Sequence, residues 1–86
     1  MPEISRFLGI VIHMYFNEHN PPHFHVKYES FRAVIDISNL SLIDGKLPPR
    51  VLSLVIEWAS LHQDKLLENW NDIIATGKFK KIKPLT

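Results

Sequence analysis

The sequence predicts a small α+β fold, in which an antiparallel β-meander of three to four strands is covered on one face by a long C-terminal helix. Residues 9–47 contain short alternating apolar and polar segments, and residues 49–76 repeat apolar side chains at spacings of three and four. Short links favour a meander, because a parallel return needs about a dozen residues or more. We expect one domain over residues 1–86.

The predicted domain has three parts: a β-meander in residues 1–47, a helical part in residues 48–76 and a basic tail in residues 77–86. Its core is small, so a partner chain or a second copy in a homodimer would add stability.

The strands follow from the alternation of side chains. Residues 9–16 form the first predicted strand, and the Asn and Pro residues of 17–22 predict a turn. Residues 23–28 and 31–37 form the next two strands, and residues 40–43 a short fourth strand that ends at an Asp-Gly turn.

Alternation divides the side chains between two sheet faces. The apolar face, on which the helix is expected to pack, carries Ile10, Ile12, Met14, Phe24, Val26, Ala33, Ile35 and Ile37. The polar face carries His13, Tyr15, His23, His25, Lys27, Arg32 and Asp36. This assignment depends on register, since a slip of one residue would turn each side chain to the opposite face.

A helix follows Pro48-Pro49, since proline is well tolerated in the first helical turn, and Gly77 ends it. One helix face carries Val51, Val55, Ala59, His62, Leu66, Trp70 and Ile73. A straight helix of about 28 residues would be roughly 40 Å long, so we expect a break near residues 62–64 or a projecting end.

Three side chains of the helix carry separate expectations. His62 is expected to be buried with a hydrogen-bond partner. Trp58 and Trp70 are expected to anchor the core, the alternative being a place at a partner interface.

Composition limits the class of protein. The chain has no cysteine, which excludes disulfides and thiolate metal sites, and no apolar run approaches the length of about 20 residues that spans a bilayer. No signal-peptide pattern is visible, so a cytoplasmic location is expected. The net charge of +1 does not by itself predict nucleic-acid binding.

Three of the five histidines lie within residues 17–26. His23 and His25 are two residues apart in a predicted strand, so their imidazoles share a face. They could hold a divalent transition metal with His13, and with Glu18, His19 or Asp36 as further donors. The alternative is that these imidazoles are structural and brace the Asn-Pro-Pro bend.

A catalytic site without a metal or other cofactor is the third interpretation. One imidazole among His13, His23 and His25 can remove a proton while another donates one. Lys27 and Arg32 would contact a phosphate, and Tyr15 could stack on a base. Together these residues form a hypothetical ribonuclease surface.

The basic tail is a candidate for binding a partner. Its lysines alternate with two apolar residues, as in an edge strand that awaits pairing. The candidate residues are Lys78, Phe79, Lys80, Lys81, Ile82 and Lys83. Phosphate contact and a flexible chain end are the alternatives.

Several blocks of the sequence resemble one bacterial family. They are residues 1–16, the run Asn-Glu-His-Asn-Pro-Pro-His-Phe-His-Val from residue 17, Ile35-Asp36-Ile37, Leu47-Pro48-Pro49-Arg50, Glu57-Trp58-Ala59, Leu67-Glu68-Asn69-Trp70 and residues 80–85. The chain thereby resembles the domain of unknown function 4160 family over essentially its whole length.

The resemblance implies a role and no reaction. Members of that family look like toxins of small type II toxin–antitoxin modules, whose neighbour is a presumed antitoxin similar to domain of unknown function 2442. We therefore expect a toxin that a small antitoxin protein neutralises, with RNA as the first candidate target. The alternative is a non-enzymatic binding module whose histidines are structural or hold a metal.

Overall fold

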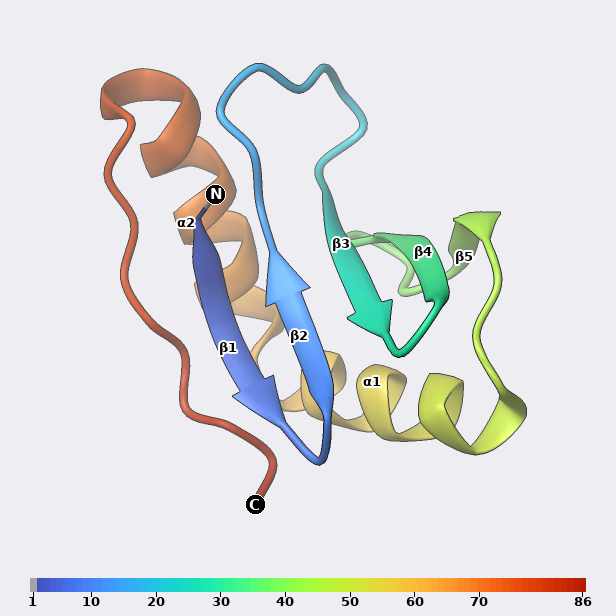
Figure 1. Cartoon of the computed structure of the whole chain (residues 1–86). Helices are drawn as coiled ribbons and strands as arrows, with labels where there is room; N and C mark the ends of the chain where they lie inside the picture. The colour runs from blue at the N-terminus through green and yellow to red at the C-terminus, as the bar shows by residue number, and fades with distance from the viewer. Residues whose placement is uncertain (1) are drawn as a thin grey trace.

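The computed structural model describes residues 2–86 and has the expected α+β architecture, with a five-stranded antiparallel meander followed by two helices (Figure 1). The strands lie side by side in chain order. They are β1 Glu3–Phe7, β2 Ile10–His13, β3 His23–Tyr28, β4 Phe31–Asp36 and β5 Leu42–Gly45. The helices are α1 Pro49–Leu61 and α2 Gln63–Thr76.

Strand β1 is an addition to the predicted meander. It pairs with β2 through a two-residue turn at Leu8 and Gly9, both of which have positive φ. Positive φ at both central residues is the geometry of a type I′ hairpin turn. Ile4 and Phe7 of β1 are buried and extend the apolar face by one strand.

The predicted apolar face of the sheet is confirmed. Each residue assigned to the apolar face is buried in the core, where α1 and α2 cover the sheet. Trp58 of α1 is fully buried, and its ring lies 5.5 Å from Phe7 and 5.9 Å from Phe24 between ring centroids. Trp70 of α2 is also buried, so both tryptophans are core anchors, as expected.

The helical part breaks at His62, within the predicted interval. His62 has a φ of −128°, and its backbone carbonyl accepts the first hydrogen bond of α2, from Leu66. The domain measures 34 Å along its longest axis, which is shorter than a straight helix of about 40 Å would be. The break lets the apolar faces of both α1 and α2 cover one sheet.

The expectation for His62 needs correction. Its side chain is half-buried rather than buried, and its ring lies 5.6 Å from the Trp58 ring. Burial, together with the positive charges of Lys65 and Lys83, lowers the pKa of His62. The residue therefore has a structural place at the helix junction.

The basic tail runs along the outer edge of β1 and is attached to the domain (Figure 1). The backbone N–H of Ile82 donates to the carbonyl of Ile4, and the Trp58 indole N–H donates to the carbonyl of Lys83. The Asn69 side chain donates to the Lys80 carbonyl and accepts from the Lys80 N–H. Because Ile82 is buried, the tail is neither a flexible end nor an unpaired strand.

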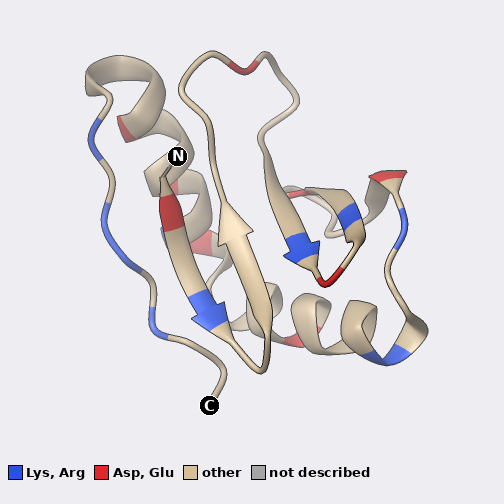
Figure 2. Ribbon diagram, in the orientation of Figure 1, with Lys and Arg blue, Asp and Glu red and all other residues tan. Residues whose placement is uncertain are grey.

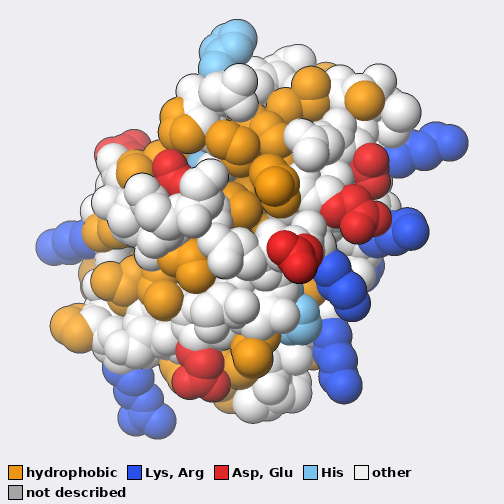
Figure 3. All heavy atoms as spheres, turned by 180° about the vertical axis from the view of Figure 1, so that it is seen from behind, with side chains coloured by type: hydrophobic (Ala, Val, Ile, Leu, Met, Phe, Trp, Pro, Cys, Tyr) orange, Lys and Arg blue, Asp and Glu red, His pale blue; other side chains and the backbone are white. Residues whose placement is uncertain are grey.

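The surface of the helical side combines apolar and charged side chains (Figure 3). Leu61, Leu67 and Ile74 are exposed on the helices. Neither helix of the described residues 2–86 is long and apolar enough to cross a membrane.

Candidate functional site

The sheet face opposite the helices carries the candidate site. Antiparallel register places His13 of β2 directly opposite His25 of β3, and His25 directly opposite Val34 of β4. Val34 in turn faces Asp44 of β5. Directly opposed side chains on one face of a sheet are within contact distance, so both imidazoles belong to one row across the sheet.

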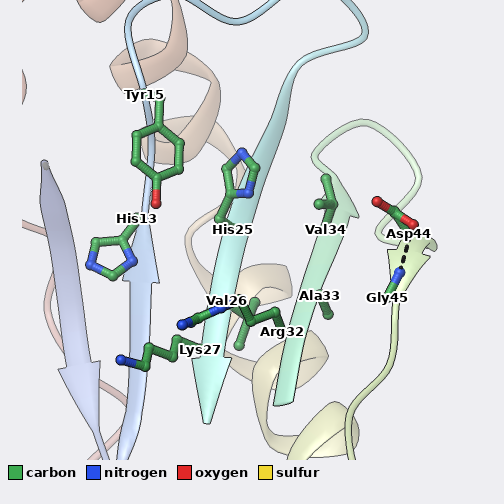
Figure 4. Close-up of a pocket in the computed structure, with 10 residues that line it drawn as sticks. All are labelled: His13, Tyr15, His25, Val26, Lys27, Arg32, Ala33, Val34, Asp44 and Gly45. Carbon is green, nitrogen blue, oxygen red and sulfur yellow. Dashed lines mark hydrogen bonds between the residues drawn. The ribbon is translucent and has the colours of Figure 1, made fainter. Parts of the chain in front are cut away.

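A hollow of about 280 Å³ lies over this row (Figure 4). His13, His25, Lys27 and Arg32 line it, and Asp44 closes the far side. Tyr15 lies next to both imidazoles, with ring centroids 6.1 Å from His13 and 4.6 Å from His25 (Figure 4). The aromatic ring and the imidazoles form the upper wall of the hollow.

Two cations form its lower part. Lys27 and Arg32 are directly opposed on β3 and β4, and both side chains reach toward β2 below His13 (Figure 4). Within residues 2–86, no carboxylate lies within 4.0 Å of either cationic group. Opposed like charges are unfavourable in a sheet, and an anion between them would remove that cost.

A second hollow, of about 780 Å³, extends the same face toward β1. It shares His13, Tyr15, Lys27 and Arg32 with the first hollow. Arg6 on its rim is paired with Glu3, at 2.8 Å between guanidinium nitrogen and carboxylate oxygen. Figure 2 shows basic segments on β1 and along the tail that runs beside it.

His13 is buried, and this burial lowers its pKa, while the nearby Glu3 carboxylate acts in the opposite direction. A lower pKa keeps the imidazole neutral near pH 7, which is the form that can accept a proton. The location of His13 therefore suits a general base.

A separate cluster lies at the upper end of β3 and in the loop before it. The Nε2 atom of His25 is hydrogen-bonded to Oε1 of Glu18, and Nε2 of His23 lies 3.5 Å from the same oxygen. Partial burial opposes ionisation of Glu18, but its contacts with the two histidines prevail and lower its pKa. Glu18 is therefore a carboxylate shared by two imidazoles.

The predicted catalytic set is thus divided. His23 does not line either hollow: its ring is buried, 5.0 Å from Trp70 and 5.3 Å from His25 between centroids. Nδ1 of His23 is 2.7 Å from the Pro21 carbonyl, which accounts for the bracing role considered for this bend. His25 is the residue that belongs both to the first hollow and to the cluster with Glu18.

The remaining candidate donors fall outside the cluster. Asp36 is buried and its Oδ1 accepts hydrogen bonds from the backbone N–H groups of Ser38 and Asn39, so it shapes the turn after β4. His19 is exposed in the loop. His13 is not part of the group formed by Glu18, His23 and His25, in contrast to the metal set considered from sequence.

Comparison with known families gives one result. Residues 9–71 match the family described as Domain of unknown function (DUF4160). The chain belongs to the DUF4160 family. The matched region begins just before β2 and ends within α2. It therefore includes His13 and His25, which line the hollows, and the cluster of Glu18, His23 and His25. No curated protein and no solved structure matched the chain.

Proposed function

We propose that this DUF4160 protein is the toxin of a bacterial type II toxin–antitoxin module, and that it acts on RNA in the cytoplasm through the open sheet face. A small antitoxin protein similar to domain of unknown function 2442 would neutralise it. The observation that carries the RNA part is the pair Lys27 and Arg32, opposed without a carboxylate partner among residues 2–86, below two imidazoles.

This arrangement suits phosphodiester cleavage. Lys27 and Arg32 would bind the scissile phosphate and stabilise the negative charge that develops on its oxygens. Neutral His13 would take the proton of the ribose 2′-hydroxyl, whose oxygen attacks phosphorus. A protonated His25 would give its proton to the departing 5′-oxygen, leaving a 2′,3′-cyclic phosphate and a 5′-hydroxyl. Tyr15 offers a ring on which a base can stack.

The antitoxin would contact the tail through its exposed residues. The exposed lysines of the tail are Lys78, Lys80, Lys81 and Lys83. Phe79 is partly exposed, whereas Ile82 is buried in the core. An acidic partner surface would complement these lysines. This contact lies on β1's edge of the molecule, away from β5.

The proposal is tested by induced expression in a bacterial host. We expect growth arrest by the wild-type chain, relief by the neighbouring antitoxin gene, and cleavage of RNA by the purified protein. The variant Lys27→Ala/Arg32→Ala should lose cleavage by at least about 100-fold, because the loss of even one stabilising donor is of that scale. Arg50→Ala/Lys65→Ala removes the same charge from exposed positions on the helices and should leave cleavage unchanged.

Each failure has its own meaning. Absence of arrest by the folded wild-type protein would refute the toxin role. Arrest with intact cellular RNA would refute RNA as the target. Equal loss in both double variants would show a general charge effect and refute the sheet face as the site.

A non-enzymatic binding module is the second candidate, and the contacts of Glu18 with both His23 and His25 favour it. In such a module these histidines are structural or hold a metal. The protein would then bind a partner without turnover, and the Lys27→Ala/Arg32→Ala variant would keep its effect on growth.

A further inference from the structure

We propose that Glu18, His23 and His25 form a binding site for a divalent transition metal ion, with zinc as the ion that best fits the donors. The site goes beyond the proposed action on RNA and does not depend on it. Two imidazoles and one carboxylate are a donor set that zinc binds in proteins, with a fourth position left for water or substrate.

The three donor atoms lie near one another, and the distance between two of them is close to that of an occupied site. One ligand atom from each of the three residues lies within 4.8 Å of the other two. The separation of 3.5 Å between Nε2 of His23 and Oε1 of Glu18 is close to the spacing of about 3.3 Å between ligands on a tetrahedral zinc. Small side-chain rotations would therefore suffice to place all three donors around one ion.

The contacts of His23 fix its tautomer and its ring orientation in a form that suits a metal ligand. Its Nδ1 lies 2.7 Å from the Pro21 carbonyl, so Nδ1 carries the proton and donates, and the lone pair is left on Nε2. Metal-binding histidines commonly have such a partner on the second ring nitrogen, which fixes the tautomer and the ring orientation. Packing of the ring on Trp70 further restricts its orientation.

The donors are also accessible from solvent on one side. The side chains of Glu18 and His25 are each 28% exposed, whereas that of His23 is 10% exposed. An ion could enter past Glu18 and His25 and would be held from behind by His23. Tyr15 lies beside the site, because its ring contacts that of His25.

An occupied site would change the role of His25. An imidazole that ligates a metal through Nε2 cannot also donate a proton to a leaving group. Metal binding and the acid role proposed for His25 would therefore exclude each other, and zinc would inhibit cleavage that relies on this residue.

The test is titration of the purified, untagged protein with ZnCl₂ by isothermal calorimetry, with Co²⁺ absorption as a second readout. We expect one equivalent of zinc per chain. Glu18→Gln and His25→Ala should weaken binding at least about tenfold, and His19→Ala should stay within twofold of the wild type. His19 is a matched control because it is an exposed histidine of the same loop. Circular dichroism would verify that every variant is folded.

The outcomes separate this site from the proposed function. Absence of stoichiometric binding by the folded wild type, or unchanged binding in both ligand variants, would overturn the metal site and leave Glu18 as a brace of the loop. Neither result bears on growth arrest. Conversely, zinc binding with the expected loss in Glu18→Gln would support the site even if the protein were not a toxin, since Lys27 and Arg32 take no part in it.

Discussion

Lys27 and Arg32 lie directly opposite each other on β3 and β4, on the sheet face that the helices leave open. Among residues 2–86 no carboxylate is close enough to pair with either cation. Such a pair costs folding free energy in the absence of an anion, because like charges opposed on a sheet repel each other. The arrangement is therefore easier to explain by binding than by stability.

This repulsion predicts that Arg32→Gln makes the domain more stable in low salt, by about 0.2–1 kcal/mol. Urea unfolding at low and high ionic strength would measure it, and the gain should shrink in high salt as screening increases. Arg50→Gln on α1 is the control and should change stability little. A loss of stability in Arg32→Gln at low salt would contradict the repulsion.

The lowered pKa of His13 predicts a stability that falls on acidification. The unfolded histidine titrates near 6.5, and the buried one below that value, so the unfolded state binds more protons as the pH drops below neutrality. Unfolding free energy should therefore decrease from pH 7.5 to pH 5.5. His13→Gln should show a smaller decrease than the wild type when urea midpoints are compared at the two pH values.

His62 serves as a reference for that experiment, because its pKa is lowered in the same direction. A His62→Gln variant should also reduce the pH dependence, and the double variant should reduce it further. An unchanged pH dependence in His13→Gln would show that burial does not control the protonation of His13.

How far the sequence predicts the fold is visible in particular elements. The strand residues 23–28 and the two sheet faces follow from alternation, which depends only on side-chain polarity. Strand β1 lies outside the predicted meander because Glu3–Phe7 is short and only two of its side chains, Ile4 and Phe7, are large and apolar. The Gly9 after it, which takes positive φ in the hairpin turn, was a usable signal.

Alternation also predicts part of the candidate site, but not the contacts that depend on distant segments of the chain. Alternation placed His13, His25, Lys27 and Arg32 on one face, and the structure brings these residues together around the hollow. It could not separate His23, because whether a strand-end imidazole turns to the hollow or packs on Trp70 depends on a helix far along the chain. The approach of Glu18 to both imidazoles likewise depends on the course of the loop, for which local pattern holds little information.

Gly45 at the end of β5 is predicted to be intolerant of a side chain. Its φ is +75°, and a Cβ there would lie 2.1 Å from the backbone carbonyl oxygen of Arg32. Because backbone atoms cannot move aside as a flexible side chain can, Gly45→Ala should cost at least about 2 kcal/mol of unfolding free energy. It should also disturb the floor of the hollow, which Gly45 lines.

Gly77 is the matched control for this substitution. Its φ of +74° is nearly the same, but no heavy atom lies within 4 Å of the position that a Cβ would take. Gly77→Ala should therefore show only the backbone preference, about 1 kcal/mol. Thermal unfolding of both variants would measure the difference, and equal losses would show that the contact with Arg32 does not matter.

Asn69 is predicted to hold the basic tail in place. Its buried side chain makes two hydrogen bonds with the backbone of Lys80, with donor–acceptor distances of 2.7 Å and 3.0 Å. Asn69→Ala removes both bonds and should cost about 1–3 kcal/mol. The freed tail should also be cut faster by trypsin at its lysines, because cleavage follows local opening.

Asn71→Ala, at an exposed position of the same helix, is the control and should leave both stability and cleavage nearly unchanged. If trypsin cleaved the Asn69→Ala tail no faster than that of the wild type, the contacts of Ile82 and Lys83 alone would be enough to fix the tail along β1.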